Sequence, residues 1–312
     1  MKENISLFIE SLNKILIGKR DRIELITAAI LSGGNILLED MPGVGKTIIS
    51  KSIASLIMDD DTKKPVKFSR IQATPDLLPY DITGVDLYNQ DLKDFVFKPG
   101  PVFADILLTD ELNRTTPKVQ SALLEAMAEK QVTVGRKTYK LSELFFVIAT
   151  QNPVESEGTY PLPAAQLDRF AICMTIGYPD LDHEQEILRS GGSEKRLLTL
   201  LPVISKSELI ELRQAVMKVT VDDKIIEAIS RIAKKTRELK EVKLGLSTRA
   251  LLMMKGMLCS YAFLKDRTFV NDQDLIDLAP FVWSHRLIVN NPQIKADDII
   301  NRITRDEVKK IV

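Results

Sequence analysis

The chain has 312 residues, of which 45% are hydrophobic and 28% charged, a composition typical of a globular protein of about two domains. Lysine plus arginine equals aspartate plus glutamate at 43 each, so the basic surface of a nucleic-acid-binding protein is not expected overall. No apolar stretch reaches the roughly 18 residues of a membrane span, and the N-terminus lacks the apolar core of a secretory signal. We therefore expect a cytoplasmic protein. Cys173 and Cys259 are expected to be buried free thiols, and with His183 and His285 they show no zinc-ligand spacing.

The first half of the chain alternates between predicted strands and helices. Strands are predicted, in order, at 36–39, 66–71, 105–109, 144–150 and 171–176. Helices are predicted at 20–32, at 47–58 and from Thr116-Pro117 onward. Residues 74–101 read as irregular, with a short helix at 75–78 and a hairpin that pairs 85–88 with 95–97, and a second hairpin is predicted at 131–141. This alternation indicates an α/β fold with a parallel sheet and right-handed connections.

The pattern changes after Tyr178-Pro179. No buried apolar strand is apparent between 181 and 312. Ser205 and Glu208 form a capping box that opens a helix. Further helices are predicted near 222–240, 248–265, 272–280 and 295–310. We therefore predict an α/β core at 1–178 and a smaller all-helical domain at 179–312.

The first predicted strand leads into a turn that contains Gly43 and Gly45. Backbone N–H groups in such a turn surround an anion, and the positive end of the following helix adds to the attraction. Lys46 would reach the β- and γ-phosphates of a nucleotide, and the Thr47 hydroxyl would bind Mg²⁺. The usual pattern G-x-x-x-x-G-K-[ST] has glycine where this chain has Asp40, so a chance Gly/Lys turn stands as the alternative.

A second chemical signal is the acid pair Asp110-Glu111, which ends the short apolar run at 105–109. Ligands of open α/β sheets bind at the carboxyl ends of the strands. Because successive strand residues point to opposite sides, Asp110 could hold Mg²⁺ while Glu111 faces a water in line with the γ-phosphate. A strand that ends in solvated acids is the alternative, and the phosphate turn upstream argues against it.

Together these motifs make the chain resemble the MoxR-type AAA+ ATPases of the helix-2-insert clade, over nearly its whole length. The stretches that carry the resemblance are residues 110–114, 117–127, 149–153, 157–163 and 166–170. The form Leu38-Glu39-Asp40 before the phosphate turn is one that this family tolerates. Residues 74–101 match its insertion within the second helix, and 131–141 match its hairpin before the sensor strand. The sequences Gly245–Arg249 and Asp266-Arg267 depart from the family's pattern.

The resemblance implies a role for individual residues. Asn152 is similar to sensor 1, which positions the attacking water, although an Asn-Pro turn is its plain alternative. Arg169 is similar to the arginine finger that reaches a neighbouring subunit, and its alternative is a surface arginine. Arg249 is similar to sensor 2. Arg114 and Arg286 match family positions without an evident physical role. The implied nucleotide contacts are Pro42, Gly43, Val44, Gly45, Lys46, Thr47, Ile48 and Arg249, the metal ligands are Thr47 and Asp110, and the catalytic residues are Glu111, Asn152 and Arg169.

The function implied by the resemblance is Mg²⁺-dependent ATP hydrolysis by a ring of identical subunits, expected to be a hexamer. Such proteins act as chaperone-like remodellers of partner proteins, often ones with von Willebrand factor A domains. This chain contains no such domain, so its client would be a separate polypeptide. Three alternatives remain: a nucleotide-binding switch or scaffold with little turnover, a DNA-acting AAA+ motor and a small-molecule kinase. The neutral net charge disfavours the motor, and the Asp-Glu pair with the Gln151-Asn152-Pro153 strand end disfavours the kinase.

Overall fold

The structure, a computed structural model, describes residues 2–41, 43–152 and 158–311. The chain divides into two compact units. The first consists of residues 1–23, 37–162 and 175–209, and the second of residues 24–36, 163–174 and 210–312. The domain boundary predicted at 178/179 remains a prediction. None of the helices within the described ranges is both long and apolar enough to span a membrane.

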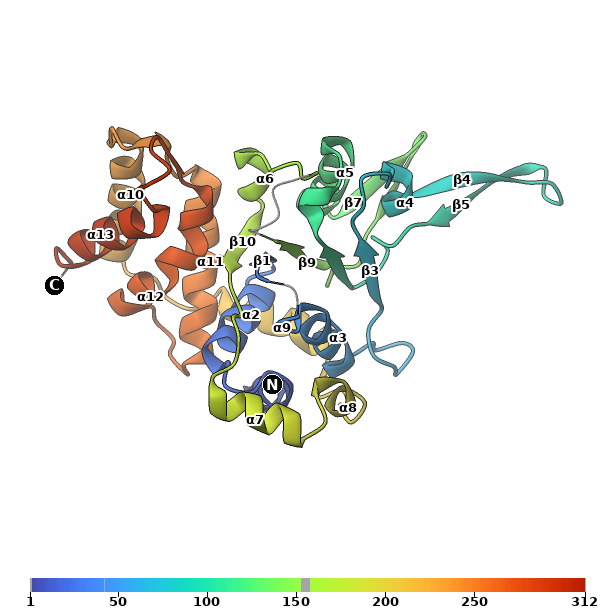
Figure 1. The fold of residues 1–312 in the computed structure, drawn as a ribbon, viewed down its shortest axis with the longest axis horizontal. Helices are drawn as coiled ribbons and strands as arrows, with labels where there is room; N and C mark the ends of the chain where they lie inside the picture. Colours follow the sequence, from blue (N-terminus) through green and yellow to red (C-terminus); the bar gives the residue numbers. More distant parts are fainter. Residues whose placement is uncertain (1, 42, 153–157, 312) are drawn as a thin grey trace. The chain divides into compact units, whose positions relative to one another are not determined.

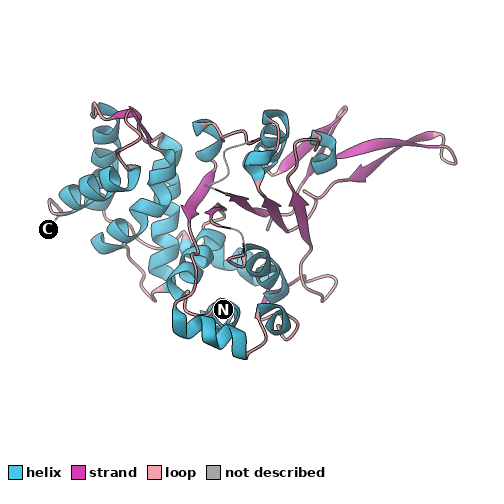
Figure 2. Ribbon diagram, viewed as in Figure 1, coloured by secondary structure: helices cyan, strands magenta, loops and turns pink. Residues whose placement is uncertain are grey.

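The largest sheet among the described residues has five strands (Figures 1 and 2). Its strands are β1 (Asn35–Glu39), β3 (Phe68–Gln72), β6 (Ile106–Asp110), β9 (Phe146–Gln151) and β10 (Phe170–Met174), in the order β10-β1-β9-β6-β3. Strands β3 and β6 pair in parallel, as do β6 and β9. All five residues of β6 are buried, as expected for a strand covered on both faces. The register places Gln72 opposite Asp110, so polar residues gather at one edge of the sheet.

Helices of the first unit include three that the sequence reasoning did not identify. They are α1 (Lys2–Ile15), α7 (Leu181–Arg189) and α8 (Ser193–Leu197). In α1, Ile5, Phe8, Leu12 and Ile15 are buried at helical spacing. The predicted helices at 47–58 and from 117 are confirmed as α3 (Lys46–Leu56) and α5 (Pro117–Glu129), except that the last two residues of the first, 57 and 58, form a short strand. The capping box of α9 (Lys206–Val216) is also present, with Ser205 and Glu208 bonded reciprocally.

The segment 74–101 is mostly a long antiparallel hairpin, β4 (Gly84–Asn89) with β5 (Asp94–Pro99). The helix predicted at 75–78 is wrong: α4 occupies Pro79–Thr83, because Leu78 is extended before the proline that begins the helix. The second predicted hairpin is confirmed as β7 (Gln131–Val134) with β8 (Lys137–Lys140). Phe97 stacks on Tyr139 with ring centroids 4.0 Å apart, so the two hairpins share an aromatic contact.

The second unit is built mainly from helices. They are α2 (Arg20–Leu31, from Glu24 on), most of α9, α10 (Asp223–Glu238), α11 (Thr248–Leu264), α12 (Asp272–Trp283) and α13 (Ala296–Val308). Residues beyond 181 also form short strands, which the sequence did not reveal: β12 (Val242–Leu244) pairs with β13 (Ile288–Val289), and β11 (Ile204–Ser205) pairs with β2 (Ile57–Met58). Runs of two or three residues carry too little periodicity to be recognised. The predicted class, a parallel α/β core with a helical second part, is confirmed.

Candidate nucleotide-binding site

The phosphate turn connects the end of β1 to the start of α3. Gly43 and Gly45 have φ angles of 88° and 90°, a left-handed region that other residues seldom adopt. Among the described residues, and apart from each glycine's chain neighbours, no atom lies within 4 Å of a Cβ built on Gly43 or Gly45, so backbone conformation, and not crowding, is what calls for glycine here. The backbone N–H of Ile49 donates to the Gly45 carbonyl at 3.0 Å, which begins the hydrogen-bond ladder of α3 at the second glycine. The N–H groups of a helix's first turn are the ones that bind anions in such turns. Pro42, a predicted contact, lies outside the described residues.

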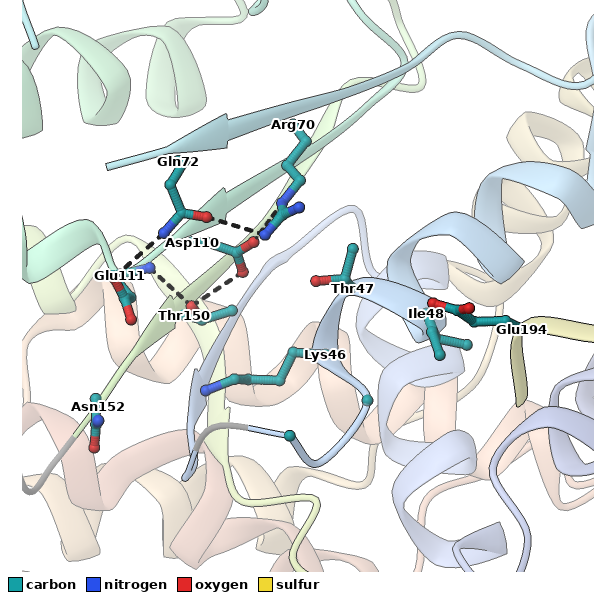
Figure 3. Close-up of a pocket in the computed structure, with 12 residues that line it drawn as sticks. Lys46, Thr47, Ile48, Arg70, Gln72, Asp110, Glu111, Thr150, Asn152 and Glu194 are labelled. Carbon is teal, nitrogen blue, oxygen red and sulfur yellow. Dashed lines mark hydrogen bonds and ion pairs between the residues drawn. The ribbon is translucent and has the colours of Figure 1, made fainter. Parts of the chain in front are cut away.

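A cavity of about 400 Å³ opens beside this turn within the first unit (Figure 3). It brings together most of the predicted nucleotide and metal contacts with two predicted catalytic residues. Its lining consists of Gly43, Gly45, Lys46, Thr47, Ile48, Arg70, Gln72, Asp110, Glu111, Thr150, Asn152 and Glu194. The phosphate turn and the acid pair, predicted separately, therefore face one space.

Lys46 lies in the cavity with its Nζ donating to the Asp40 carbonyl at 2.7 Å. Burial lowers the pKa of Lys46, and the carboxylates of Asp40, Asp110 and Glu111 oppose that shift. The Lys46 side chain therefore lies within the electrostatic influence of three acidic side chains. The Asp40 side chain does not block the cavity: it points to the backbone N–H groups of Ile176 and Gly177.

Both acids of the predicted pair are engaged by other side chains. Arg70 Nε donates to Asp110 Oδ2 at 2.6 Å, and Thr150 Oγ1 lies 3.4 Å from Asp110 Oδ1. Glu111 Oε2 accepts from Gln72 Nε2 at 3.3 Å and pairs with Arg114 Nε at 3.0 Å. Figure 3 shows Arg70 and Gln72 reaching from β3 toward the two acids.

Glu111 has a strained backbone, with φ 57° and ψ 45° in the left-handed region. Its N–H donates to Thr150 Oγ1 at 2.9 Å, which holds this conformation in place. Strain of this kind costs on the order of 1–3 kcal/mol and is concentrated at functional sites. The conformation turns the chain sharply at the end of β6 and directs the Glu111 side chain into the cavity.

Sequence reasoning missed Arg70, Gln72 and Thr150, although a signal for them existed. Arg70 and Gln72 alternate along β3, and Thr150 lies near the end of β9, so all three lie toward the carboxyl ends of strands beside β6. Because the carboxyl ends of parallel strands meet at one edge, polar residues there were candidates. Arg114, which had no assigned role, is placed by its ion pair with Glu111.

A second, apolar cavity of about 160 Å³ adjoins the phosphate turn in the same unit. It contains Val44, the one predicted contact of the described turn that does not line the larger cavity. One wall comes from residues 15–19, and another from residues 176–179. Lys19 Nζ donates to the Tyr178 carbonyl at 2.7 Å and joins these two walls.

The remaining predicted residues belong to the second unit. Arg169 is half-buried between the short helix α6 (Ala164–Leu167) and β10. Arg249 lies in the first turn of α11, with Nη1 3.8 Å from Asp168 Oδ2. Asp168 also accepts from Arg286 Nε at 3.0 Å and from the N-cap hydroxyl of Ser247 at 2.9 Å.

Arg286 thereby acquires a physical role that the sequence did not suggest. Its side chain is only 2% exposed, and its guanidinium bonds to the backbone carbonyls of Phe170 and Val282 in addition to Asp168. Burial lowers the pKa of Arg286 to about 10, against the opposing charge of Asp168. The buried pair fastens the segment that carries Arg169 to the turn that follows α12.

Comparison with known proteins agrees with this arrangement. Residues 35–172 match the family described as ATPase family associated with various cellular activities (AAA), and residues 234–305 match the AAA lid domain. A crystal structure of a protein from Cytophaga hutchinsonii, provisionally named an ATPase, superposes with a TM-score of 0.87 at 37% identity. The superposition covers 97% of this chain and 94% of that one.

Two relatives extend the likeness over nearly the whole chain. Protein YeaC of Bacillus subtilis, which is uncharacterised, is 46% identical over 291 residues, or 93% of this chain and 88% of its own. Chaperone MoxR1 of Mycobacterium tuberculosis is 36% identical over 309 residues, or 95% of this chain and 79% of its own. The matched family and these relatives agree with the motifs and the cavity, and the chain therefore belongs to the MoxR-type AAA+ ATPases.

Proposed function

We propose that this chain binds ATP with Mg²⁺ in the 400 Å³ cavity and hydrolyses the terminal phosphate. The observation that carries the proposal is the convergence of the phosphate turn, Lys46 and the acid pair on one space. Phosphoryl transfer to water depends on positioning and on stabilising charge, and calls for little covalent chemistry from the protein. The cavity contains groups that can position the phosphates and groups that can stabilise their charge.

Several residues that line the cavity have distinct roles in the proposed reaction. The turn and Lys46 bind the phosphates, with Lys46 leaving the Asp40 carbonyl for a phosphate oxygen. Glu111 accepts the proton of the attacking water, and Asn152, buried at the end of β9, orients that water. Thr47 and Asp110 would provide oxygen ligands for Mg²⁺.

The donor set fits Mg²⁺. This ion prefers oxygen ligands and keeps several waters, so one hydroxyl and one carboxylate suffice. Both line the same cavity, and within the described residues no cluster of three or more metal-binding side chains competes for the ion. When bound, the ion would neutralise charge that develops on the phosphates.

The apolar cavity supports a nucleotide as the ligand. It begins at Gly43–Gly45, and most of its lining residues have apolar side chains, which suits a purine base. The two cavities share Gly43, Gly45 and Ile48, so a triphosphate in one and its base in the other would be continuous.

The proposal extends to a ring of subunits. In such a ring, Arg169 would act as an arginine finger in the nucleotide site of a neighbouring subunit. Arg249 would contact the phosphates of the nucleotide bound to its own subunit. A finger supplied by another subunit contributes about 10³–10⁵ in rate. Activity per subunit should therefore rise with protein concentration through the assembly range. A flat specific activity across that dilution series would contradict the ring.

Two substitutions test the chemistry. Glu111→Gln should retain ATP binding and stop phosphate release, whereas Lys46→Ala should weaken ATP binding by about tenfold or more, because a charged hydrogen bond contributes about 1.5–3 kcal/mol. Calorimetry and a phosphate-release assay measure the two effects. If Glu111→Gln hydrolyses ATP at the wild-type rate, a residue other than Glu111 activates the water. If the wild-type protein binds ATP but does not hydrolyse it, a nucleotide-binding switch is favoured.

The cellular role that we propose is remodelling of a separate client protein, such as one with a von Willebrand factor A domain. A relative is named a chaperone, and the β4–β5 hairpin exposes Leu87, Tyr88, Leu92 and Phe95. Co-purification with Glu111→Gln, which should hold ATP and client together, tests this role. Adding Phe95→Ser to that variant should reduce capture without altering ATP affinity. Stimulation of hydrolysis by DNA would instead favour a DNA-acting motor.

A further inference from the structure

Asp40 occupies the position where the usual phosphate-turn pattern has glycine. The residue is only 5% exposed, yet it does not line the phosphate cavity. Its carboxylate accepts the backbone N–H of Ile176 and, at 3.2 Å from Oδ2, the N–H of Gly177. These are charge-assisted hydrogen bonds made by a buried acid, the kind that contributes most to holding two segments together.

A carboxylate at this position has an evident cost. Its charge acts on Lys46, whose Nζ bonds to the Asp40 carbonyl. The same negative charge must repel a triphosphate bound in the turn. Glycine would avoid both the repulsion and the burial of a charge. Because the carboxylate weakens phosphate binding, we expect its hydrogen bonds to Ile176 and Gly177 to favour nucleotide binding in another way.

Those groups belong to the wall of the apolar cavity. Ile176 and Gly177 lead into Tyr178 and Pro179, and all four line that cavity beside Gly43 and Gly45. Lys19 also holds this segment, through the Tyr178 carbonyl. Asp40, the first residue of the phosphate turn, is thus hydrogen-bonded directly to the wall against which a base would lie.

We infer that Asp40 is a positioning residue that fixes the wall of the apolar cavity relative to the phosphate turn, so that base and phosphates are recognised as one ligand. The inference rests on the proposed nucleotide-binding function. It assigns Asp40 to recognition of the nucleoside part alone. Toward the phosphates its effect is neutral or unfavourable.

This assignment predicts a selective effect of Asp40→Gly. Affinity for ATP should fall about tenfold, since a hydrogen bond to a charged group contributes about 1.5–3 kcal/mol and Lys19 continues to hold the wall. Affinity for inorganic tripolyphosphate should stay the same or rise, because a repulsive charge is removed. Asp40→Asn, which keeps one acceptor oxygen, should give an intermediate loss for ATP.

The experiment is calorimetric titration of the full-length chain with ATP and with tripolyphosphate, each in the presence of Mg²⁺. The quantity compared is the affinity for ATP divided by the affinity for tripolyphosphate, which within one preparation is independent of the fraction of the protein that is folded. Asp40→Gly should lower this ratio, and Lys19→Met should lower it as well, because it loosens the same wall. Asp91→Gly, the same replacement in the exposed turn between β4 and β5, should leave both affinities unchanged.

Equal losses for both ligands in Asp40→Gly would overturn the inference, because Asp40 would then serve the phosphate turn itself. Unchanged ATP affinity would overturn it too. Failure of the wild-type chain to bind ATP would instead refute the proposed function, and the inference would fall with it. Binding by wild type with no selective loss in Asp40→Gly would refute the inference alone.

Discussion

Removal of the Asp168 carboxylate should leave the buried guanidinium of Arg286 without its counter-charge. The Arg286 side chain is 2% exposed and that of Asp168 is 15% exposed, so water can compensate little. Breaking a buried ion pair by deleting one partner costs about 3–5 kcal/mol. We expect Asp168→Ala to cost about 3 kcal/mol, at the lower end, because Arg286 keeps the carbonyls of Phe170 and Val282 as acceptors.

The sole tryptophan of the chain provides the assay. Trp283 is fully buried in α12 of the second unit, close in sequence to Arg286, and its Nε1 donates to the Ala250 carbonyl at 3.2 Å. Its fluorescence in urea therefore reports unfolding of the unit that contains the ion pair. Because a chain of two units need not unfold in one step, a probe placed within the second unit is required.

A double-mutant cycle with Arg286→Met isolates the interaction. Once the guanidinium is absent, Asp168→Ala should cost less than about 1 kcal/mol, which gives a coupling energy of about 2 kcal/mol or more. Asp306→Ala, the same replacement of an exposed acid in α13 of the second unit, serves as the matched control and should be close to neutral. Additive effects of the two substitutions would refute the view that Asp168 and Arg286 stabilise the second unit as a pair.

Three further outcomes are expected. Glu307→Gln should destabilise the second unit by about 1–2 kcal/mol at pH 7, a value kept low because the cations around Glu307 are half exposed. Burial acts to raise the pKa of Glu307, but Lys235, Lys310 and Arg231 together lower it to about 2. The stabilisation is therefore present above pH 4.5 and lost on acidification toward pH 2. Burial lowers the pKa of His285 well below 6.5, so stability should fall as the pH drops below 6.5, and His285→Phe should flatten that part of a pH series of urea melts. Arg70→Met, which removes the ion pair with Asp110, should lower the Mg²⁺ concentration needed for tight ATP binding by about two- to fivefold, as measured by calorimetry at several Mg²⁺ concentrations.

The sequence reveals those parts of the site that lie within short contiguous motifs. Strand, glycine turn and helix follow one another over 36–47, so the position of Lys46 and Thr47 could be predicted from local geometry. The acid pair after 105–109 could be placed at the same sheet edge because the rule for parallel strands is general. Both predictions rely on periodicities that a single segment displays.

The parts that escaped prediction depend on pairing between distant segments. Arg70 and Asp110 meet only because β3 and β6 align in one register, and a shift of one residue would turn Arg70 to the other face. Asp168 and Arg286 are 118 positions apart, and their contact requires the packing of η2 (Ser284–Arg286) near α6. The Asp40 carboxylate bonds to backbone N–H groups, which leave no trace in side-chain identity.

The exposures of the paired side chains indicate which partner moves when a nucleotide enters. The Arg70 side chain is 46% exposed, whereas the Asp110 side chain that it contacts is 9% exposed and also lies near Thr150. The arginine can therefore swing away at little cost, while the acid stays on its buried strand. Glu111 is likewise fixed by a strained backbone and the Thr150 hydroxyl, whereas its partners Gln72 and Arg114 are side chains at the rim. On the proposed function, the acids are pre-placed and the change on binding is an exchange of their partners, which requires no rearrangement of the sheet.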